Sequence, residues 1–223
     1  MVQMAVSPLP QWFEGSEYTH KVAVCVMKYG PISRITLAQI LGLSQGAVSR
    51  ITSDLIYAGV IEETPMPSGK AGKLPKGFVQ KENAERRGRP QTGLRIIENA
   101  RSFVGMKINA THISAVAVNA IGQIITGCHD LEIEDTSPQT VVALIKQLTI
   151  DCSDEAEMAG WPKPYAVGIS LGGYVIDNAV VTFAPFMHWS QPVELSAMVH
   201  EATGLPTGIY NDIDSLVVDA CLF

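Results

Sequence analysis

The sequence predicts a protein of mixed α+β and α/β class in two parts, a winged helix-turn-helix followed by an α/β lobe. Three observations carry this prediction. Residues 33–63 have the spacing of two short helices running into a strand, and residues 102–223 alternate short strands with helical segments. Residues 1–101 hold 13 Lys and Arg against 8 Asp and Glu, whereas residues 102–223 hold 3 against 14. The net charges of +5 and −11 indicate two domains with different partners, and the basic one suits nucleic acid.

Two helices are expected between residues 36 and 59, with Thr36 capping the first and Ser44 the second. Gly42 and Gly59 stand where left-handed residues end helices. A helix over 18–29 would complete a three-helix unit after a loose arm at 1–17. The residues that recur at helical spacing, and should face inward, are Val48, Ile51, Leu55 and Ala58.

The outward face of the second helix is small or polar, with one cation. A helix that enters the major groove needs short residues for close approach, and amide or guanidinium groups for base edges and phosphates. The alternative is a helical hairpin that only builds the core. The residues expected to contact DNA here are Thr36, Ser44, Gln45, Gly46, Ala47, Ser49, Arg50 and Ser53.

A basic, glycine-rich stretch over 65–91 follows, between expected strands around Ile61 and over 94–97. Such a segment cannot build a core but can lie along phosphates. Its strip Arg87, Gly88, Arg89 and Pro90 suits a narrow minor groove, which favours an extended wing in an 18–101 DNA-binding domain. The alternative is a solvated linker whose charge aids solubility.

The second part is expected to begin with strands and then to alternate helix and strand, as in an α/β lobe. A turn is expected at Gly172 and Gly173. The expected strands are 103–108, 113–118, 123–127, 165–171, 180–183 and 207–210, and the expected helices are 138–155, 193–202 and 212–222.

Composition is that of a folded cytoplasmic protein, with 47% hydrophobic and 17% charged residues. No apolar run approaches transmembrane length, and residues 1–10 lack the pattern of a signal peptide. The scattered spacing of the cysteines favours free thiols over a disulfide framework or a metal site. These cysteines are Cys25, Cys128, Cys152 and Cys221.

The order of motifs resembles the repressor branch of the ROK family (repressors, open reading frames and sugar kinases), over nearly the whole chain. The resemblance rests on the helix-turn-helix, GRP at 88–90, VGMKINATHISAVAVNAIGQII at 104–125, GISLGGYVID at 168–177, APFMHW at 184–189 and GLPTGIYNDIDS at 204–215.

The resemblance implies an actin-like, ribonuclease-H-like lobe that binds a sugar, coupled to a DNA-binding head. Its implied sugar contacts are Asn211 and Asp212, with Gly172 and Gly173 shaping the pocket. In the family's kinases the aspartate matching Asp212 is the general base; alternatively, the pair only caps a helix. The implied partners are double-stranded operator DNA, a small sugar effector and a second copy of the chain, with no membrane.

Departures from the kinase pattern argue against catalysis. The first hairpin has Lys107, Asn109 and Ala110 in place of the kinases' acidic residue and two glycines. A lysine cannot ligate magnesium, and side chains at the other two positions hinder phosphate approach. We therefore expect no catalytic residue, cofactor or metal. Phe186 stands where many members place an asparagine near the sugar.

The resemblance stops at Phe223, before the second lobe and the Cys/His zinc site of the family, so about half of a full-length member is expected. The histidines His129, His188 and His200 do not replace that zinc site.

The sequence thus favours a transcriptional regulator of sugar-metabolism genes, such as a xylose or N-acetylglucosamine repressor. The alternatives are a truncated, non-functional remnant of such a regulator, or a ROK sugar kinase with an added domain.

Overall fold

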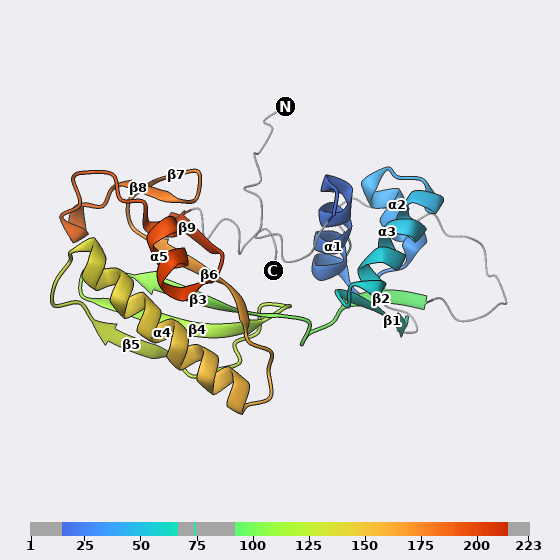
Figure 1. Cartoon of the computed structure of the whole chain (residues 1–223). Coiled ribbons are helices and arrows are strands. Elements are labelled where there is room, and N and C mark those ends of the chain that lie inside the picture. The colour runs from blue at the N-terminus through green and yellow to red at the C-terminus, as the bar shows by residue number, and fades with distance from the viewer. Residues whose placement is uncertain (1–14, 67–73, 75–91, 214–223) are drawn as a thin grey trace. The chain divides into compact units, whose positions relative to one another are not determined.

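The computed structural model describes residues 15–66, 74 and 92–213. They form two compact units that divide between Ala100 and Arg101 (Figure 1). The predicted arm up to residue 14, most of the wing with Arg87, Gly88, Arg89 and Pro90, and the expected helix beyond residue 213 lie outside the described residues.

The first unit opens with three helices: α1 (Glu17–Tyr29), α2 (Arg34–Leu41) and α3 (Gln45–Tyr57). Each begins at a serine whose hydroxyl accepts a hydrogen bond from a backbone amide of the first turn: Ser16, Ser33 and Ser44. The predicted cap at Ser44 is confirmed. Gly42 and Gly59 both have positive φ, as the expected helix ends require.

Two predictions for these helices are wrong. Ser33, not Thr36, caps α2; Thr36 lies within the helix, is 3% exposed and donates its backbone amide to the Ser33 hydroxyl. Its burial also removes it from any DNA-contacting face. Ala58 is exposed because α3 ends at Tyr57, whereas Val48, Ile51 and Leu55 are buried as predicted.

A two-stranded antiparallel sheet follows, formed by β1 (Ile61–Pro65) and β2 (Thr92–Ile96). Leu94 also bridges to Ile32 ahead of α2, which adds a third segment to the sheet. Arg34 of α2 ties this sheet to the helices: it pairs with Glu63 at 2.8 Å and donates to the Thr52 hydroxyl at 2.9 Å.

The second unit is built on a mixed five-stranded sheet in the order β5-β4-β3-β6-β9. Strand β4 pairs antiparallel with β5 and with β3, whereas β3, β6 and β9 run parallel to one another. This arrangement confirms the predicted α/β class. The strands are β3 (Ser102–Ile108), β4 (His112–Asn119), β5 (His129–Glu132), β6 (Pro164–Leu171) and β9 (Thr207–Asn211).

Two helices, α4 (Pro138–Met158) and α5 (Leu195–Thr203), cover one face of this sheet (Figure 1). Ser137 caps α4 and Pro138 opens it, so the helix begins at the residue where it was predicted to begin. Buried side chains of both helices and of alternate strand positions form one apolar core, in which Ile145, Leu148 and Val199 are fully buried. Among the described residues, no helix is long and apolar enough to cross a membrane.

Strand positions were predicted less well around this core. Residues 123–127 were expected to form a strand, but only Ile124 makes a bridge, to Val118. The Thr126 hydroxyl accepts from the Ala117 amide, so a side chain takes a position that a strand carbonyl would fill. Strands β5 and β7 were not predicted from the sequence. A small hairpin of β7 (Tyr174–Ile176) and β8 (Val180–Phe183) precedes the 3-10 helix η1 (Pro185–Met187).

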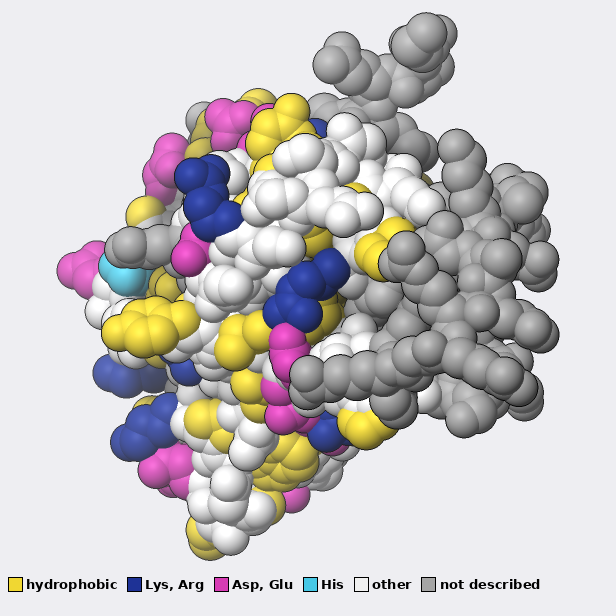
Figure 2. Space-filling view, turned by 90° about the vertical axis from the view of Figure 1, so that its right-hand side faces the viewer, with side chains coloured by type: hydrophobic (Ala, Val, Ile, Leu, Met, Phe, Trp, Pro, Cys, Tyr) yellow, Lys and Arg dark blue, Asp and Glu magenta, His cyan; other side chains and the backbone are white. Residues whose placement is uncertain are grey.

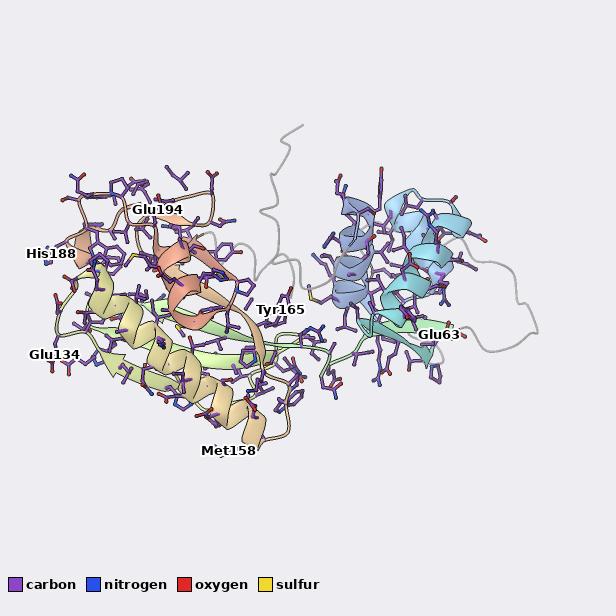
Figure 3. The ribbon with its side chains drawn as sticks, viewed as in Figure 1. Glu63, Glu134, Met158, Tyr165, His188 and Glu194 are labelled. Atoms are coloured by element: carbon purple, nitrogen blue, oxygen red, sulfur yellow. The ribbon has the colours of Figure 1, made fainter. Side chains whose placement is uncertain are left out.

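The position of α4 across the sheet gives a stability prediction. Leu148→Ala should lower the free energy of unfolding of the second unit by about 2–5 kcal/mol, because Leu148 is fully buried and truncation leaves a cavity. Met158→Ala at the exposed end of the same helix (Figure 3) is the control, since that side chain is 83% exposed. Urea unfolding followed by circular dichroism measures both, and equal losses would contradict this packing.

Candidate functional sites

The outward face of α3 carries most of the side chains predicted to contact DNA. Gln45, Gly46, Ser49, Arg50 and Ser53 are exposed, together with the capping residue Ser44, while Ala47 is half-buried. Their amide, hydroxyl and guanidinium groups lie on one helix. Beside them, a Cβ built on Gly46 would have no described atom within 4 Å, so the surface there is open. The face can therefore approach a surface closely and offer hydrogen bonds to it.

Arg50 is the cation of this face that is available to a ligand. Arg34 and Arg95 pair with Glu63 and Glu62, and Lys21 pairs with Glu17, so these cations are engaged within the unit. Arg50 makes no ion pair within the described part of the chain. Figure 2, which looks at the molecule from the right-hand side of Figure 1, shows no continuous patch of Lys and Arg side chains among the described residues.

A second site lies at the carboxyl edge of the three parallel strands. Lys107 of β3 is in register with Ser170 of β6 and Tyr210 of β9, so the ends of these strands lie side by side. Gly172 and Gly173 directly follow β6, and Asp212 directly follows β9 at the first turn of a helix. Ligands of open α/β sheets bind at this edge.

Asp212 is held at this edge by two donors. The Ser170 hydroxyl donates to its Oδ1 at 2.5 Å, and the Lys107 ammonium lies 3.7 Å from its Oδ2. The Asp212 side chain is 32% exposed and that of Lys107 62% exposed, so a ligand can reach both. A carboxylate held in this way can accept hydrogen bonds from hydroxyl groups.

Asn211 connects the other predicted residues. Its side-chain amide donates to the Gly173 carbonyl at 2.5 Å, and its Oδ1 accepts from the Ile213 amide at 2.8 Å. The hydrogen bond to the Ile213 amide is the one that a helix cap makes, so Asn211 also fits the alternative prediction that it caps a helix. A Cβ on Gly173 would lie 2.6 Å from the Phe183 carbonyl oxygen, so this position has no room for a side chain. The structure thus brings together the four residues that the resemblance assigned to a sugar.

The β3–β4 turn, which in kinases of this type would face phosphate, is satisfied internally. The Asn109 side-chain oxygen accepts from the backbone amides of Thr111 and His112 at 2.9 and 2.8 Å. A phosphate oxygen would have to displace this carboxamide to reach the same two donors.

Two features of the ligand site were not predicted. Ser170 was part of a predicted strand, but nothing in its sequence context marked it as a partner of Asp212, because their contact spans 42 positions. Lys107 was recognised as a departure from the kinase pattern. Its ion pair with Asp212 was not predicted, because it depends on the order of the strands in the sheet.

Other titratable groups, in both units, are held within the fold. The Gly127 amide and then His129 hold the pKa of the Glu155 carboxyl below its usual value. Burial raises the pKa of the Cys25 and Cys152 thiols to about 11, which makes them poor nucleophiles and metal ligands. Within the described ranges no three His, Cys, Asp or Glu side chains are placed to hold a metal ion.

Known transcriptional repressors are similar to this chain in sequence. The xylose repressor of Bacillus spizizenii is 22% identical over 193 residues, which are 85% of this chain and 44% of that repressor. The DNA-binding transcriptional repressor Mlc of Escherichia coli is 22% identical over 198 residues, 87% of this chain and 44% of Mlc. The predicted resemblance to ROK repressors is confirmed.

A solved structure shows the same fold. A ROK family transcriptional regulator, described as a homologue of E. coli Mlc, matches 92% of this chain and 48% of its own, with a TM-score of 0.68 and 23% identity. No protein-family model matches the chain. The chain spans less than half the length of each of these relatives.

The tight packing around the glycine pair can be tested directly. Gly173→Ala should lower the free energy of unfolding of the lobe by about 1–3 kcal/mol, because the new methyl group meets a backbone carbonyl that cannot move alone. Gly172→Ala should cost less, since its nearest neighbour at 3.3 Å is the ring of Phe186, which can shift. Chemical denaturation of the two variants compares them, and a larger loss for Gly172→Ala would contradict the described loop.

Proposed function

We propose that this chain is part of a DNA-binding transcriptional repressor of sugar-metabolism genes, acting in the cytoplasm. The first unit, with α3 as its recognition helix and β1–β2 as the base of its wing, would be a winged helix-turn-helix. The second would be the first lobe of an actin-like domain that senses a sugar. The observation that carries the proposal is the exposed polar face of α3, whose Arg50 makes no ion pair with another described residue.

The relatives and the charge distribution support the DNA-binding part. Xylose repressor and Mlc are named as repressors, and Mlc as DNA-binding. Residues 1–101 carry a net charge of +5, and the strip Arg87, Gly88, Arg89 and Pro90 would add phosphate or minor-groove contacts to those of α3. Helix-turn-helix proteins commonly read two half-sites as dimers, so we propose a homodimer on operator DNA.

The carboxyl edge of the lobe supports the sensing part. Asp212, held by Ser170 and partly exposed, can accept hydrogen bonds from hydroxyl groups, and Asn211, Gly172 and Gly173 lie beside it. Only five residues, 97–101, join β2 of the head to β3 of the lobe, whose other end carries Lys107. If the DNA-binding units of a dimer can take two arrangements, a sugar that binds one arrangement more tightly would raise its population and so change the affinity for operator DNA.

Sugar phosphorylation is the second candidate function, and the geometry disfavours it. The hairpin amides are occupied by Asn109, and an ammonium rather than a metal-binding carboxylate lies beside Asp212. Phosphoryl transfer would lack both its phosphate cradle and its metal. We propose that the lobe binds sugar without turning over ATP.

Arg50→Ala tests the DNA-binding proposal. Fluorescence anisotropy on a duplex from upstream of the protein's own gene should show about tenfold or greater weakening, because the variant loses a guanidinium that reaches base edges or phosphates. Lys21→Ala is the matched control, since it removes the same charge from an ion pair on α1. A scrambled duplex and a salt series separate base contacts from phosphate contacts. Unchanged affinity of Arg50→Ala for both duplexes would refute this role for α3.

A coupled assay for ADP release tests the second proposal. With Mg²⁺, ATP and common hexoses or pentoses, the protein should release no ADP above the background of a heat-inactivated sample, because its phosphate and metal sites are replaced. Sugar-dependent turnover that is lost in Asp212→Asn would instead establish a kinase.

A further inference from the structure

An aromatic ring and a carboxylate meet beside Gly172. A Cβ built on this glycine would lie 3.3 Å from Cε1 of Phe186 and 3.7 Å from Oδ2 of Asp212. A small molecule lying against this part of the loop therefore meets one apolar group and one hydrogen-bond acceptor. Its complement is a molecule with hydroxyl donors on one side and hydrocarbon on the other.

The loop that carries Phe186 is closed at its base. The backbone amides of Ala184 and Trp189 each donate to the other's carbonyl, at 3.2 and 3.1 Å. The Trp189 indole also donates to the Thr136 carbonyl at 2.7 Å, which fastens the loop to the segment before α4. Ala184, Met187 and Trp189 are buried, whereas Phe186 keeps part of its ring exposed (His188 marks this loop in Figure 3).

Both groups are therefore in place before a ligand binds. Asp212 is oriented by Ser170 and Lys107, while the closed loop fixes the backbone that carries Phe186 and the ring packs partly against the core. A preorganised contact discriminates well because little binding energy is spent on ordering it. A phenyl ring offers neither donor nor acceptor, so a hydroxyl group held against it loses its bond to water without replacement.

We propose that Phe186 makes this site selective for a monosaccharide that presents a hydrocarbon group beside its hydroxyls. That group is the ring CH₂ of a pentopyranose or the methyl of a 6-deoxyhexose, and the hydroxymethyl of an ordinary hexose is disfavoured. The inference rests on the proposed sugar-sensing function and adds the chemical class of the effector.

Isothermal titration calorimetry on the intact protein tests it with two series of matched stereochemistry. The first is D-xylose, 6-deoxy-D-glucose and D-glucose; the second is L-arabinose, D-fucose and D-galactose. In at least one series, the dissociation constant of the pentose or of the 6-deoxy sugar should be about tenfold or more below that of the hexose. A difference of this size is typical when a single small group of a ligand is placed in apolar surroundings. Comparing pentose with 6-deoxyhexose identifies which hydrocarbon group is accepted.

Phe186→Asn should lower the affinity ratio of the pentose or 6-deoxy sugar to the hexose to about one, or invert it. The reason is that an amide can form a hydrogen bond with the hydroxymethyl group of the hexose. Phe183→Asn on β8 is the control; its ring is 43% exposed and stacks on Tyr174, and the ratio should not change. Phe186→Tyr keeps the ring packing while adding a hydroxyl, and should lower the ratio even if the asparagine variant does not fold.

Preference for the hexose in both series, or a ratio unchanged in Phe186→Asn and Phe186→Tyr, would overturn the inference and leave sugar sensing standing. Binding of none of the six sugars would overturn the sensing function and this inference with it.

Discussion

The parallel register of β3, β6 and β9 is the constraint on which the ligand site depends. Parallel neighbours need crossover connections, which α4 and α5 supply. Because these strands follow one another in one direction across the sheet, right-handed crossovers place both helices on the same face. The three carboxyl ends then share an edge, where Lys107, Ser170 and Asp212 contact one another although they are far apart in sequence.

Charge is used differently in the two units. In the first unit, Arg34 ties α2 to β1 through Glu63, and Arg95 ties β2 to β1 through Glu62. Arg50 makes no ion pair with another described residue. The chain from residue 102 onward carries a net charge of −11, so a polyanion would be repelled from it and attracted to the head. Under the proposed function, the charge difference keeps the polyanionic ligand on the first unit and away from the proposed sugar site.

Periodicity and capping residues were enough to predict α1, α3 and α4, because local hydrogen bonds and one buried face decide these helices. They failed where two residues could serve the same role: Ser33 and Thr36 both suit a cap, and packing buries Thr36. Short edge strands such as β5 depend on their neighbours, so local pattern could not place them. The four residues proposed to contact a sugar were predicted from a family resemblance, whereas the contacts of Ser170 and Lys107 with Asp212 depend on the strand order of the sheet.

The most direct test of the two proposed sites is an NMR titration of two separate samples of the ¹⁵N-labelled chain, one with its upstream duplex and one with the sugar that binds best. The account predicts that the duplex shifts amide signals of residues 44–53 and leaves those of 168–173 and 211–212 in place. The sugar alone should shift the signals of 168–173 and 211–212 and leave those of 44–53 in place. Shifts from the duplex concentrated in the lobe, with none in α3, would contradict the assignment of the two sites.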